Sequence, residues 1–248
     1  MKSSSFLPAY LLGILLFCII SCGDQTEAKD NTTADSALPD SSASPALTTP
    51  TSTFVTTPET MMFVIQKVAD YDKWLTVYDD HDSVRLANGV HNYVIGYSTT
   101  DRTRIFVALK SEQVEKAKAF GKSADLKQAM QKGGVKGTPK VNVYNITFQD
   151  TGKITTNLRS QTTFTVKDWD TFQRSYDSAR QERVDNGIMD RAYGHDADNN
   201  KKVSVVVAVV DTTKAYAFWK SDHMKELRKR AGVVGEPERF NFRIVKRY

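Results

Sequence analysis

The pattern of apolar and polar positions predicts short strands and helices that follow one another in a regular order. An unbroken apolar run fits a buried strand, and apolar residues spaced three or four apart fit a helix. The predicted elements are strand 61–65, helix 71–87, strands 91–97 and 103–109, helix 112–120, a further turn or helix from 124, and strand 141–146. Suitable caps and breaks flank them: Asp70 and Ser123 at helix starts, Asn88-Gly89 and Gly133-Gly134 at helix ends, and Pro139 before the last strand.

The same order of elements returns in the second part of the chain. The elements predicted there are strand 161–166, a helix from 169, strands 188–195 and 203–210, a helix from 212, and strand 239–245. A shift of 98 positions, which carries Asn88-Gly89 onto Asn186-Gly187, aligns the two parts. Between residues 68 and 146, 22 of 79 ungapped pairs are identical, where composition alone gives about 5. The chain therefore carries two copies of one folded unit.

Each copy reads strand-helix-strand-strand-helix-strand, which is the order of a ferredoxin-like unit. Such a unit forms a four-stranded antiparallel sheet with both helices on one face. The other face still needs a cover, because a sheet is stable only when its apolar face is buried. The second copy offers that cover. We therefore predict an α+β protein in which two tandem β-α-β-β-α-β units pack sheet to sheet.

The N-terminus has the features of an export signal followed by a tether. Lys2 precedes an apolar run at residues 6–20, which is too short for a membrane span and ends in Ser21-Cys22. This end resembles a bacterial lipobox, in which the signal is cut before the cysteine and Cys22 carries lipid. An ordinary secretory signal with an incidental cysteine is the alternative. The Ser/Thr/Pro-rich residues after Cys22 predict a disordered tether.

These observations divide the chain into five parts. They are the signal peptide 1–21, the tether 22–59, the first ferredoxin-like half 60–150, a connector 151–159 and the second half 160–248. We expect a lipoprotein of the bacterial cell envelope, held by the lipid on Cys22 at the outer membrane or the periplasmic face. Since Cys18 would leave with the signal, no intrachain disulfide is expected.

Charge and motifs exclude several other functions. The net charge is +5, and the densest basic cluster, Lys225 with Arg228, Lys229 and Arg230, is interpreted as the solvated face of a helix. We expect no nucleic-acid partner. The chain has no glycine-rich phosphate loop, nucleophile elbow or zinc-spaced His/Glu motif, so we expect no metal and no cofactor.

Three motifs that occur in both copies resemble a known family. They are Val-x-Asp-aromatic-Asp-x-aromatic from Val68 and from Val166; Arg85 with Asn88-Gly89-Val90, and Arg183 with Asn186-Gly187-Ile188; and residues 119–127 with 134–139, and 217–225 with 232–237. These segments resemble small bacterial domains of the dimeric α/β barrel superfamily, related to antibiotic-biosynthesis-monooxygenase-like and stress-responsive barrel proteins. The resemblance covers nearly all of residues 61–248 and implies a barrel between two such domains, here within one chain.

The resemblance implies a fold more than a reaction. Superfamily members with known chemistry include cofactor-independent oxygenases that act on quinol-like substrates, and haem-degrading enzymes with an Asn/Trp/His constellation. Trp74 is present in the first copy, but Phe172 takes its place in the second, and the three positions do not all match. No catalytic residue is carried over from the family.

The first helix of each copy supplies the candidates for a ligand pocket. Trp74, Tyr78, His81 and Arg85 share a narrow sector of the helix. The pocket candidates are Trp74, Tyr78 and Arg85 in the first copy and Tyr176 and Arg183 in the second. In one interpretation the Tyr and Arg line a pocket and the Arg anchors an anionic ligand. In the other, they satisfy backbone carbonyls or a carboxylate such as Asp79.

None of the four histidines is duplicated. His81 stands opposite Ala179, His91 opposite Met189, His195 opposite Tyr97 and His223 opposite Asp125. His81, close in sequence to Tyr78 and Asp82, is the candidate for proton transfer, so the candidate catalytic residues are His81, Tyr78 and Arg85. A surface or core histidine without chemistry is the alternative.

Three functions remain open at this point. The leading hypothesis is an exported, lipid-anchored binding or interaction module of unknown ligand, without catalysis. The partners considered for it are a small apolar or aromatic ligand and a second copy of the chain. The alternative is a cofactor-independent or haem-dependent monooxygenase-like enzyme with a small aromatic-substrate pocket in the first copy. A stress-related envelope protein that acts through self-association is the third. A buried cavity near His81 would favour the enzyme, and filled cores with a broad apolar outer patch would favour interaction.

Overall fold

Residues 52–248 are described by the computed structural model, and they contain the same series of eight elements twice. The predicted signal peptide, Cys22 and the tether up to residue 51 lie outside the described residues. A short strand, β1 (Phe54–Val55), comes first. The first half then consists of β2 (Glu59–Val68), α1 (Tyr71–Asp80), α2 (Asp82–Ala87), β3 (Val90–Ser98), β4 (Arg104–Ser111), α3 (Val114–Lys122), α4 (Ala124–Lys132) and β5 (Val135–Asp150).

The second half repeats this series. It consists of β6 (Leu158–Val166), α5 (Trp169–Ser178), α6 (Arg180–Asp185), β7 (Ile188–Asp196), β8 (Lys202–Val209), α7 (Thr212–Lys220), α8 (Asp222–Arg230) and β9 (Val233–Arg247). The predicted caps are present: Asp70 accepts a hydrogen bond from the backbone N–H of Lys73 at 2.7 Å, and Ser123 accepts one from Leu126 at 3.1 Å. Gly89, which ends α2, has the expected positive φ of 65°.

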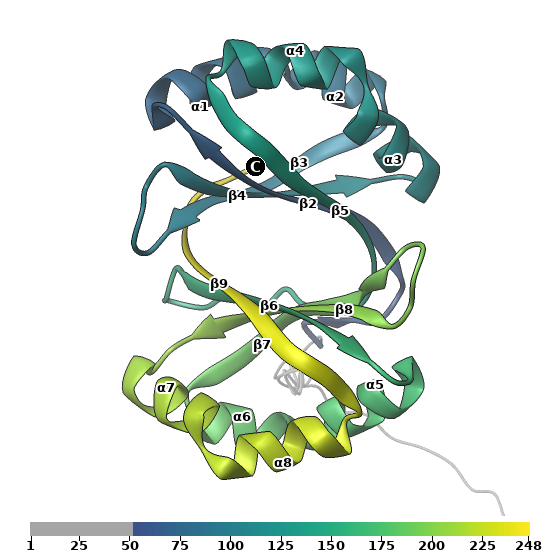
Figure 1. The fold of residues 1–248 in the computed structure, drawn as a ribbon, viewed down its shortest axis with the longest axis vertical. Helices are drawn as coiled ribbons and strands as arrows, with labels where there is room; N and C mark the ends of the chain where they lie inside the picture. The colour runs from purple at the N-terminus through teal and green to yellow at the C-terminus, as the bar shows by residue number, and fades with distance from the viewer. Residues whose placement is uncertain (1–51) are drawn as a thin grey trace, which may run out of the picture. The chain divides into compact units, whose positions relative to one another are not determined.

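The strands of the two halves form one antiparallel sheet that closes on itself. The strand order β5-β2-β4-β3-β9-β6-β8-β7 is completed by the pairing of β5 with β7. The two four-stranded sheets are therefore joined by backbone hydrogen bonds at both edges, β3 to β9 and β5 to β7, and do not merely stack. Figure 1 shows the resulting barrel, with α1–α4 on one outer side and α5–α8 on the opposite side. This is the predicted intramolecular dimeric α/β barrel.

Two glycines make the joins between the halves possible. Gly96 of β3 faces β9, where a Cβ would lie 2.5 Å from a ring carbon of Phe242. Gly194 of β7 faces β5, where a Cβ would lie 2.7 Å from the Cα of Ile146 and would overlap the carbonyl oxygen of Asn145. Real Cβ atoms do not approach other atoms so closely, so each join depends on the missing side chain. The two positions are equivalent in the repeat.

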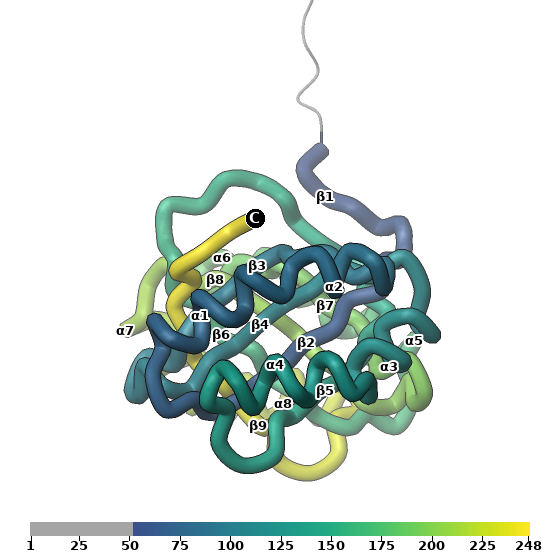
Figure 2. The backbone as a smooth tube through the Cα atoms, turned by 90° about the horizontal axis from the view of Figure 1, so that it is seen from above, coloured from purple at the N-terminus to yellow at the C-terminus, as the bar shows by residue number. Residues whose placement is uncertain are grey.

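Three apolar cores result from this arrangement, one under each helix layer and one inside the barrel. Side chains alternate between the two faces of each strand. In β2, Met62 and Val64 face the helices of the first half, while Met61 and Phe63 point into the barrel. Figure 2 shows the helices of the first half lying over its strands. The second half has its own core under α5–α8.

The predicted helix 71–87 is in fact two helices, because the chain turns at His81. The second half breaks at the equivalent residue, Ala179. Near each break an arginine side chain bonds a helix carbonyl: Arg85 donates to the oxygen of Tyr78, and Arg183 to that of Tyr176, both at 2.6 Å. A side chain that enters the hydrogen-bond ladder kinks a helix, which accounts for the break.

Four predicted boundaries were also wrong. One is that of the last strand, β9, which begins at Val233 rather than at residue 239. Strand β5 begins at Val135 rather than after Pro139. The pairing of β2 with β5 shifts register here, from Ile65 opposite Lys140 to Lys67 opposite Lys136. Pro139 lies within this shift, where no backbone N–H is needed, so it does not interrupt the strand. The tether ends earlier than residue 59: β1 pairs with the end of β5, and the Phe54 ring lies 5.4 Å from that of Phe148. Strand β6 begins at Leu158, within the predicted connector.

No helix among residues 52–248 has the length and apolar character required to cross a membrane.

Candidate binding cavities between helices and sheet

Each half contains a cavity between its helices and its sheet, at equivalent positions of the repeat. The cavity of the second half holds about 730 Å³ of empty space, and that of the first half about 460 Å³, each partly open to solvent. The enzyme hypothesis placed its pocket in the first copy. The larger cavity lies in the second.

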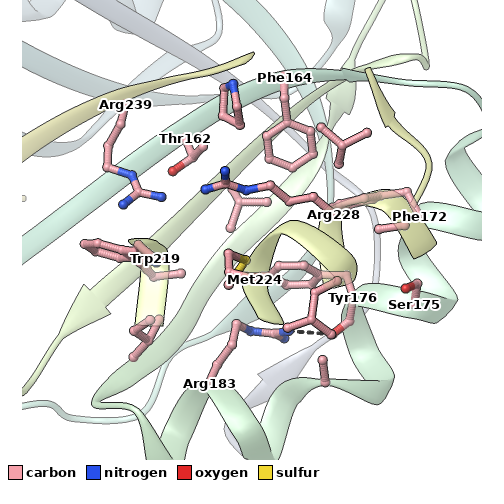
Figure 3. Close-up of a pocket in the computed structure, with 18 residues that line it drawn as sticks. Thr162, Phe164, Phe172, Ser175, Tyr176, Arg183, Trp219, Met224, Arg228 and Arg239 are labelled. Atoms are coloured by element: carbon pink, nitrogen blue, oxygen red, sulfur yellow. Dashed lines mark hydrogen bonds between the residues drawn. The ribbon is translucent and has the colours of Figure 1, made fainter. Parts of the chain in front are cut away.

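The second cavity has apolar walls. They are formed by side chains from α5, α7, α8 and the sheet, among them Phe164, Phe172, Val207, Trp219, Met224 and Leu227 (Figure 3). Thr162 and Ser175 add hydroxyl groups. None of the lining residues is a His, Asp, Glu or Cys. The cavity therefore offers an apolar, partly aromatic environment without an acidic or imidazole side chain.

Two arginines give this cavity a positive side. The guanidinium of Arg239 stacks on the Trp219 ring at 3.7 Å, and Arg228 extends across the cavity from α8 (Figure 3). Burial, reinforced by the neighbouring charge of Arg228, lowers the pKa of Arg239 to about 10. Sequence reasoning assigned Arg228 to a solvated helix face; the structure instead makes it a lining residue of the cavity.

A buried network closes the inner end of the second cavity. Arg183 donates two hydrogen bonds to the carboxylate of Asp190, at 2.9 and 2.6 Å, and its guanidinium lies 3.6 Å from the Tyr176 ring centre. The Tyr176 hydroxyl donates to the same carboxylate at 2.7 Å. Burial alone would lower the pKa of Arg183, but Tyr176 and Asp190 raise it above its ordinary value. Arg183 is therefore held charged by groups of the protein itself.

The first cavity is smaller because two larger side chains fill it. Trp74 and His81 stand where the second half has Phe172 and Ala179, and both line the first cavity together with Tyr78 and Arg85. The structure thus brings these four predicted residues together, and it brings Tyr176 and Arg183 together in the other half. The first cavity lacks counterparts of Arg228 and Arg239, because Met130 and Val141 stand at the equivalent positions.

The network of the first half is also less complete. Asn92 replaces Asp190, and it accepts the Tyr78 hydroxyl at 2.5 Å and donates to Asp82 at 2.5 Å. Arg85 contacts Asp82 only at 3.4 Å. The Nε of Arg85 is buried and has no hydrogen-bond partner among the described residues. Asp79, considered as an arginine partner from the sequence, instead binds Lys246 at 2.7 Å.

His81 is the one histidine that lines either cavity. Burial, followed by the charge of Arg85, lowers its pKa, which favours the neutral imidazole near pH 7. His91 and His223 lie on the surface beside Glu112 and Glu182, and the His195 ring lies 4.8 Å from that of Trp169. Within residues 52–248, no three His, Cys, Asp or Glu side chains gather into a group that could hold a metal ion.

Sequence reasoning missed Trp219, Arg228 and Arg239. The signal was present, because their equivalents in the first copy are Gly121, Met130 and Val141. The comparison of the two copies considered histidines and overlooked these changes in charge and size.

The comparisons with known proteins support the fold. No protein-family model matches the sequence, and no curated protein matches it. Among solved structures, the chain is similar to an anthrone oxidase-like protein at a TM-score of 0.54 and 10% identity, over 78% of this chain and 94% of that one. A candidate monooxygenase from Fusobacterium nucleatum has a TM-score of 0.50 at 13% identity, over 76% and 93%.

A third solved structure, a candidate chlorite dismutase, has a TM-score of 0.50 at 12% identity, over 76% of this chain and 95% of that one. The names of these three proteins indicate different reactions on one fold. At such low identity the likeness shows the ferredoxin-like barrel architecture and not an activity.

The arginine networks of the two halves predict different losses of stability when an aspartate in each is replaced by asparagine. Asp190→Asn removes one partner of a buried charge pair, whose carboxylate side chain is 4% exposed. It should lower the free energy of unfolding by about 2 kcal/mol. Asp82→Asn, at a carboxylate that is 46% exposed, should cost less than about 1 kcal/mol. Urea unfolding measures both, and equal losses would contradict this assignment.

Proposed function

We propose that this protein is a binding module for a small amphipathic anion, which occupies the helix–sheet cavity of the second half. The ligand has an aromatic or apolar body and one anionic group. The body contacts the apolar wall, and the anionic group pairs with Arg228 and Arg239. The observation that carries the proposal is the combination of an apolar cavity with two arginines that the first half lacks.

The electrostatics support an anionic ligand. Arg183 already has a carboxylate partner within the fold, whereas no ion pair of Arg228 or Arg239 exists among the described residues. Two neighbouring guanidinium groups repel each other, and a bound oxyanion would relieve that repulsion and accept charge-assisted hydrogen bonds. The stacking of Arg239 on Trp219 fixes the orientation of one donor group in advance.

The side chains around this cavity favour binding over catalysis. General acid–base chemistry needs a group whose pKa lies near the working pH. The titratable lining groups of the second cavity are tyrosine and arginine, and burial raises the pKa of Tyr176 well above its ordinary value. The cavity can select a ligand by shape and charge, but it offers no group to take a proton from it near pH 7.

The binding proposal is tested by substitutions that place residues of the first half at the equivalent positions of the second half. The full chain should bind 2-naphthoate better than the neutral 2-naphthalenemethanol. Arg228→Met should weaken 2-naphthoate binding about tenfold and leave the neutral compound unchanged, because it removes one charge-assisted contact. Ala179→His should weaken binding of both compounds, since the imidazole occupies the cavity. Isothermal titration calorimetry measures each affinity.

Arg230→Gln, an exposed change on the same helix, serves as the control and should bind both compounds as the original chain does. Equal affinity for the two compounds, or unchanged binding in both cavity variants, would refute the proposed ligand site.

A monooxygenase-like reaction in the first cavity is the second candidate function. It is favoured by His81, whose lowered pKa suits a proton acceptor beside a cavity, and by the named activities of the structural neighbours. With anthrone as the probe, oxidation of its CH₂ group to C=O would consume one O₂ and release one water. His81 would accept a proton from this CH₂ group, and the loss of that proton would make the carbon electron-rich.

Oxygen uptake tests this second candidate. The full chain should consume O₂ with anthrone, and His81→Ala should lower the rate about 100-fold, the loss expected for a general base. His91→Ala, at an exposed position, should have no effect. Uptake at the rate of buffer alone would end this candidate.

The binding module is proposed to act at the bacterial cell envelope, anchored by lipid on Cys22. The lipobox-like segment and the Ser/Thr-rich residues after it support this proposal. Labelled palmitate fed to expressing cells should enter the original chain and the Cys18→Ala variant but not the Cys22→Ala variant. Label of equal strength in Cys22→Ala would exclude the anchor.

A further inference from the structure

One end of the barrel interior collects three arginines, in a space separate from both helix–sheet cavities. Arg159 of β6, Arg191 of β7 and Arg247 of β9 line a partly open cavity with about 500 Å³ of empty space, part of which is open solvent. Its apolar side is formed by residues of the barrel core, including Met61, Val94 and Phe242. The site therefore joins a positively charged opening to a tightly packed apolar floor.

Arg159 is the most deeply buried of the three, with 3% of its surface exposed. Its Nη1 donates to the carbonyl oxygens of Thr156 and Leu158, at 2.8 and 2.9 Å. Its Nε and Nη2 have no hydrogen-bond partner among the described residues and are available to the cavity. Burial, followed by the charges of Arg191 and Arg247, lowers the pKa of Arg159 to about 10. A buried cation is thus held beside two others.

The single carboxylate that lines this cavity does not neutralise the cluster. Asp150 pairs through Oδ2 with Arg191 at 3.1 Å. Its Oδ1 accepts hydrogen bonds from the Thr53 hydroxyl at 2.7 Å and from the Gly152 N–H at 2.8 Å. Its Oδ2 is thus engaged by Arg191, and neither oxygen accepts a hydrogen bond from Arg159 or Arg247 among the described residues. Arg159 and Arg247 therefore have no ion-pair partner among the described residues. Arg247 is exposed, but Arg159 is buried, and a buried charge without a counter-charge is costly.

The barrel itself does not require these arginines. The equivalent positions of the first half hold Met61, Tyr93 and Gln149, which are all neutral. They lie in β2, β3 and β5, which pair with their neighbours as β6, β7 and β9 do. The fold tolerates neutral side chains at every one of the three positions, so the positive charge of the second half needs another explanation.

We propose that this end of the barrel binds a single oxyanion group, a phosphate or a carboxylate, between Arg159, Arg191 and Arg247. Guanidinium groups match the oxygen geometry of both anions and donate several parallel hydrogen bonds. The bound anion supplies the missing counter-charge. Since the floor of the cavity is filled by core side chains, the site accommodates the anionic group and only a short extension. The same chemistry occurs in a free phosphate and in the headgroup of a phospholipid.

The test replaces two of the arginines, Arg159 and Arg247, with their neutral equivalents from the first half. In the full chain, inorganic phosphate, acetate and glycerol 3-phosphate are titrated separately and followed by NMR and by urea unfolding. Phosphate should raise the resistance to unfolding, because a ligand that binds only the folded state stabilises it. Arg159→Met should weaken phosphate binding at least tenfold, and Arg247→Gln several-fold. Tighter binding of glycerol 3-phosphate than of phosphate would identify a headgroup-like ligand.

Two further measurements separate a binding role from a structural one. Phosphate should raise the urea midpoint of the original chain but not that of Arg159→Met. Any difference between the two chains without phosphate reflects instead the loss of the hydrogen bonds from Arg159 to the carbonyls of Thr156 and Leu158. The control Arg243→Gln, at an exposed arginine of β9 that does not line the cavity, should bind phosphate unchanged. If none of the three anions binds, if Arg159→Met and Arg247→Gln bind phosphate as the original chain does, or if phosphate stabilises Arg159→Met as much as the original chain, the proposal is overturned.

Discussion

The structure depends on the backbone pairing that joins the two halves at both edges, β3 with β9 and β5 with β7. Each half alone would expose one apolar sheet face and two unpaired edge strands, which are prone to association with other chains. Closing the barrel buries that face and uses both edges at once. Gly96 and Gly194 lie at these two joins, at equivalent positions of the repeat, and permit the close approach of the strands. Duplication thus supplies within one chain a closure that a single half would need a partner to provide.

Once closure is achieved, the repeat leaves each half free to diverge at its cavities. Both halves keep the Tyr-Arg pair that marks the break between their first two helices. They differ in what surrounds it: Trp74 and His81 fill the first cavity, while Phe172 and Ala179 leave the second one open. The arginines of the two proposed anion sites also belong to the second half: Arg228 and Arg239 in one, and Arg159, Arg191 and Arg247 in the other. The physical difference between the halves is therefore one of volume and charge, on a common framework.

Most of the framework could be predicted from the sequence, because strand alternation, helix caps and glycine stops are local signals. The caps at Asp70 and Ser123 are examples. The break at His81 could not be predicted, since it accompanies a contact between Arg85 and a carbonyl seven residues away. The role of Arg228 was missed because a basic cluster on a helix resembles a solvated face, and only the packing of α8 against the sheet turns this side chain toward a cavity. Arg159 gave no local signal either, because its neighbours Arg191 and Arg247 come from other strands.

The central claim is that divergence opened a ligand site in the second half and left the first half with a smaller cavity that lacks the two arginines. The most direct measurement is a methyl NMR spectrum of the full chain during addition of 2-naphthoate, with alanine and methionine methyl groups labelled. The account predicts shifts at Ala179, Met224 and Ala231, which line the second cavity, and none at Ala129 and Met130, which line the first. Shifts confined to Ala129 and Met130, or equal shifts in both halves, would contradict it.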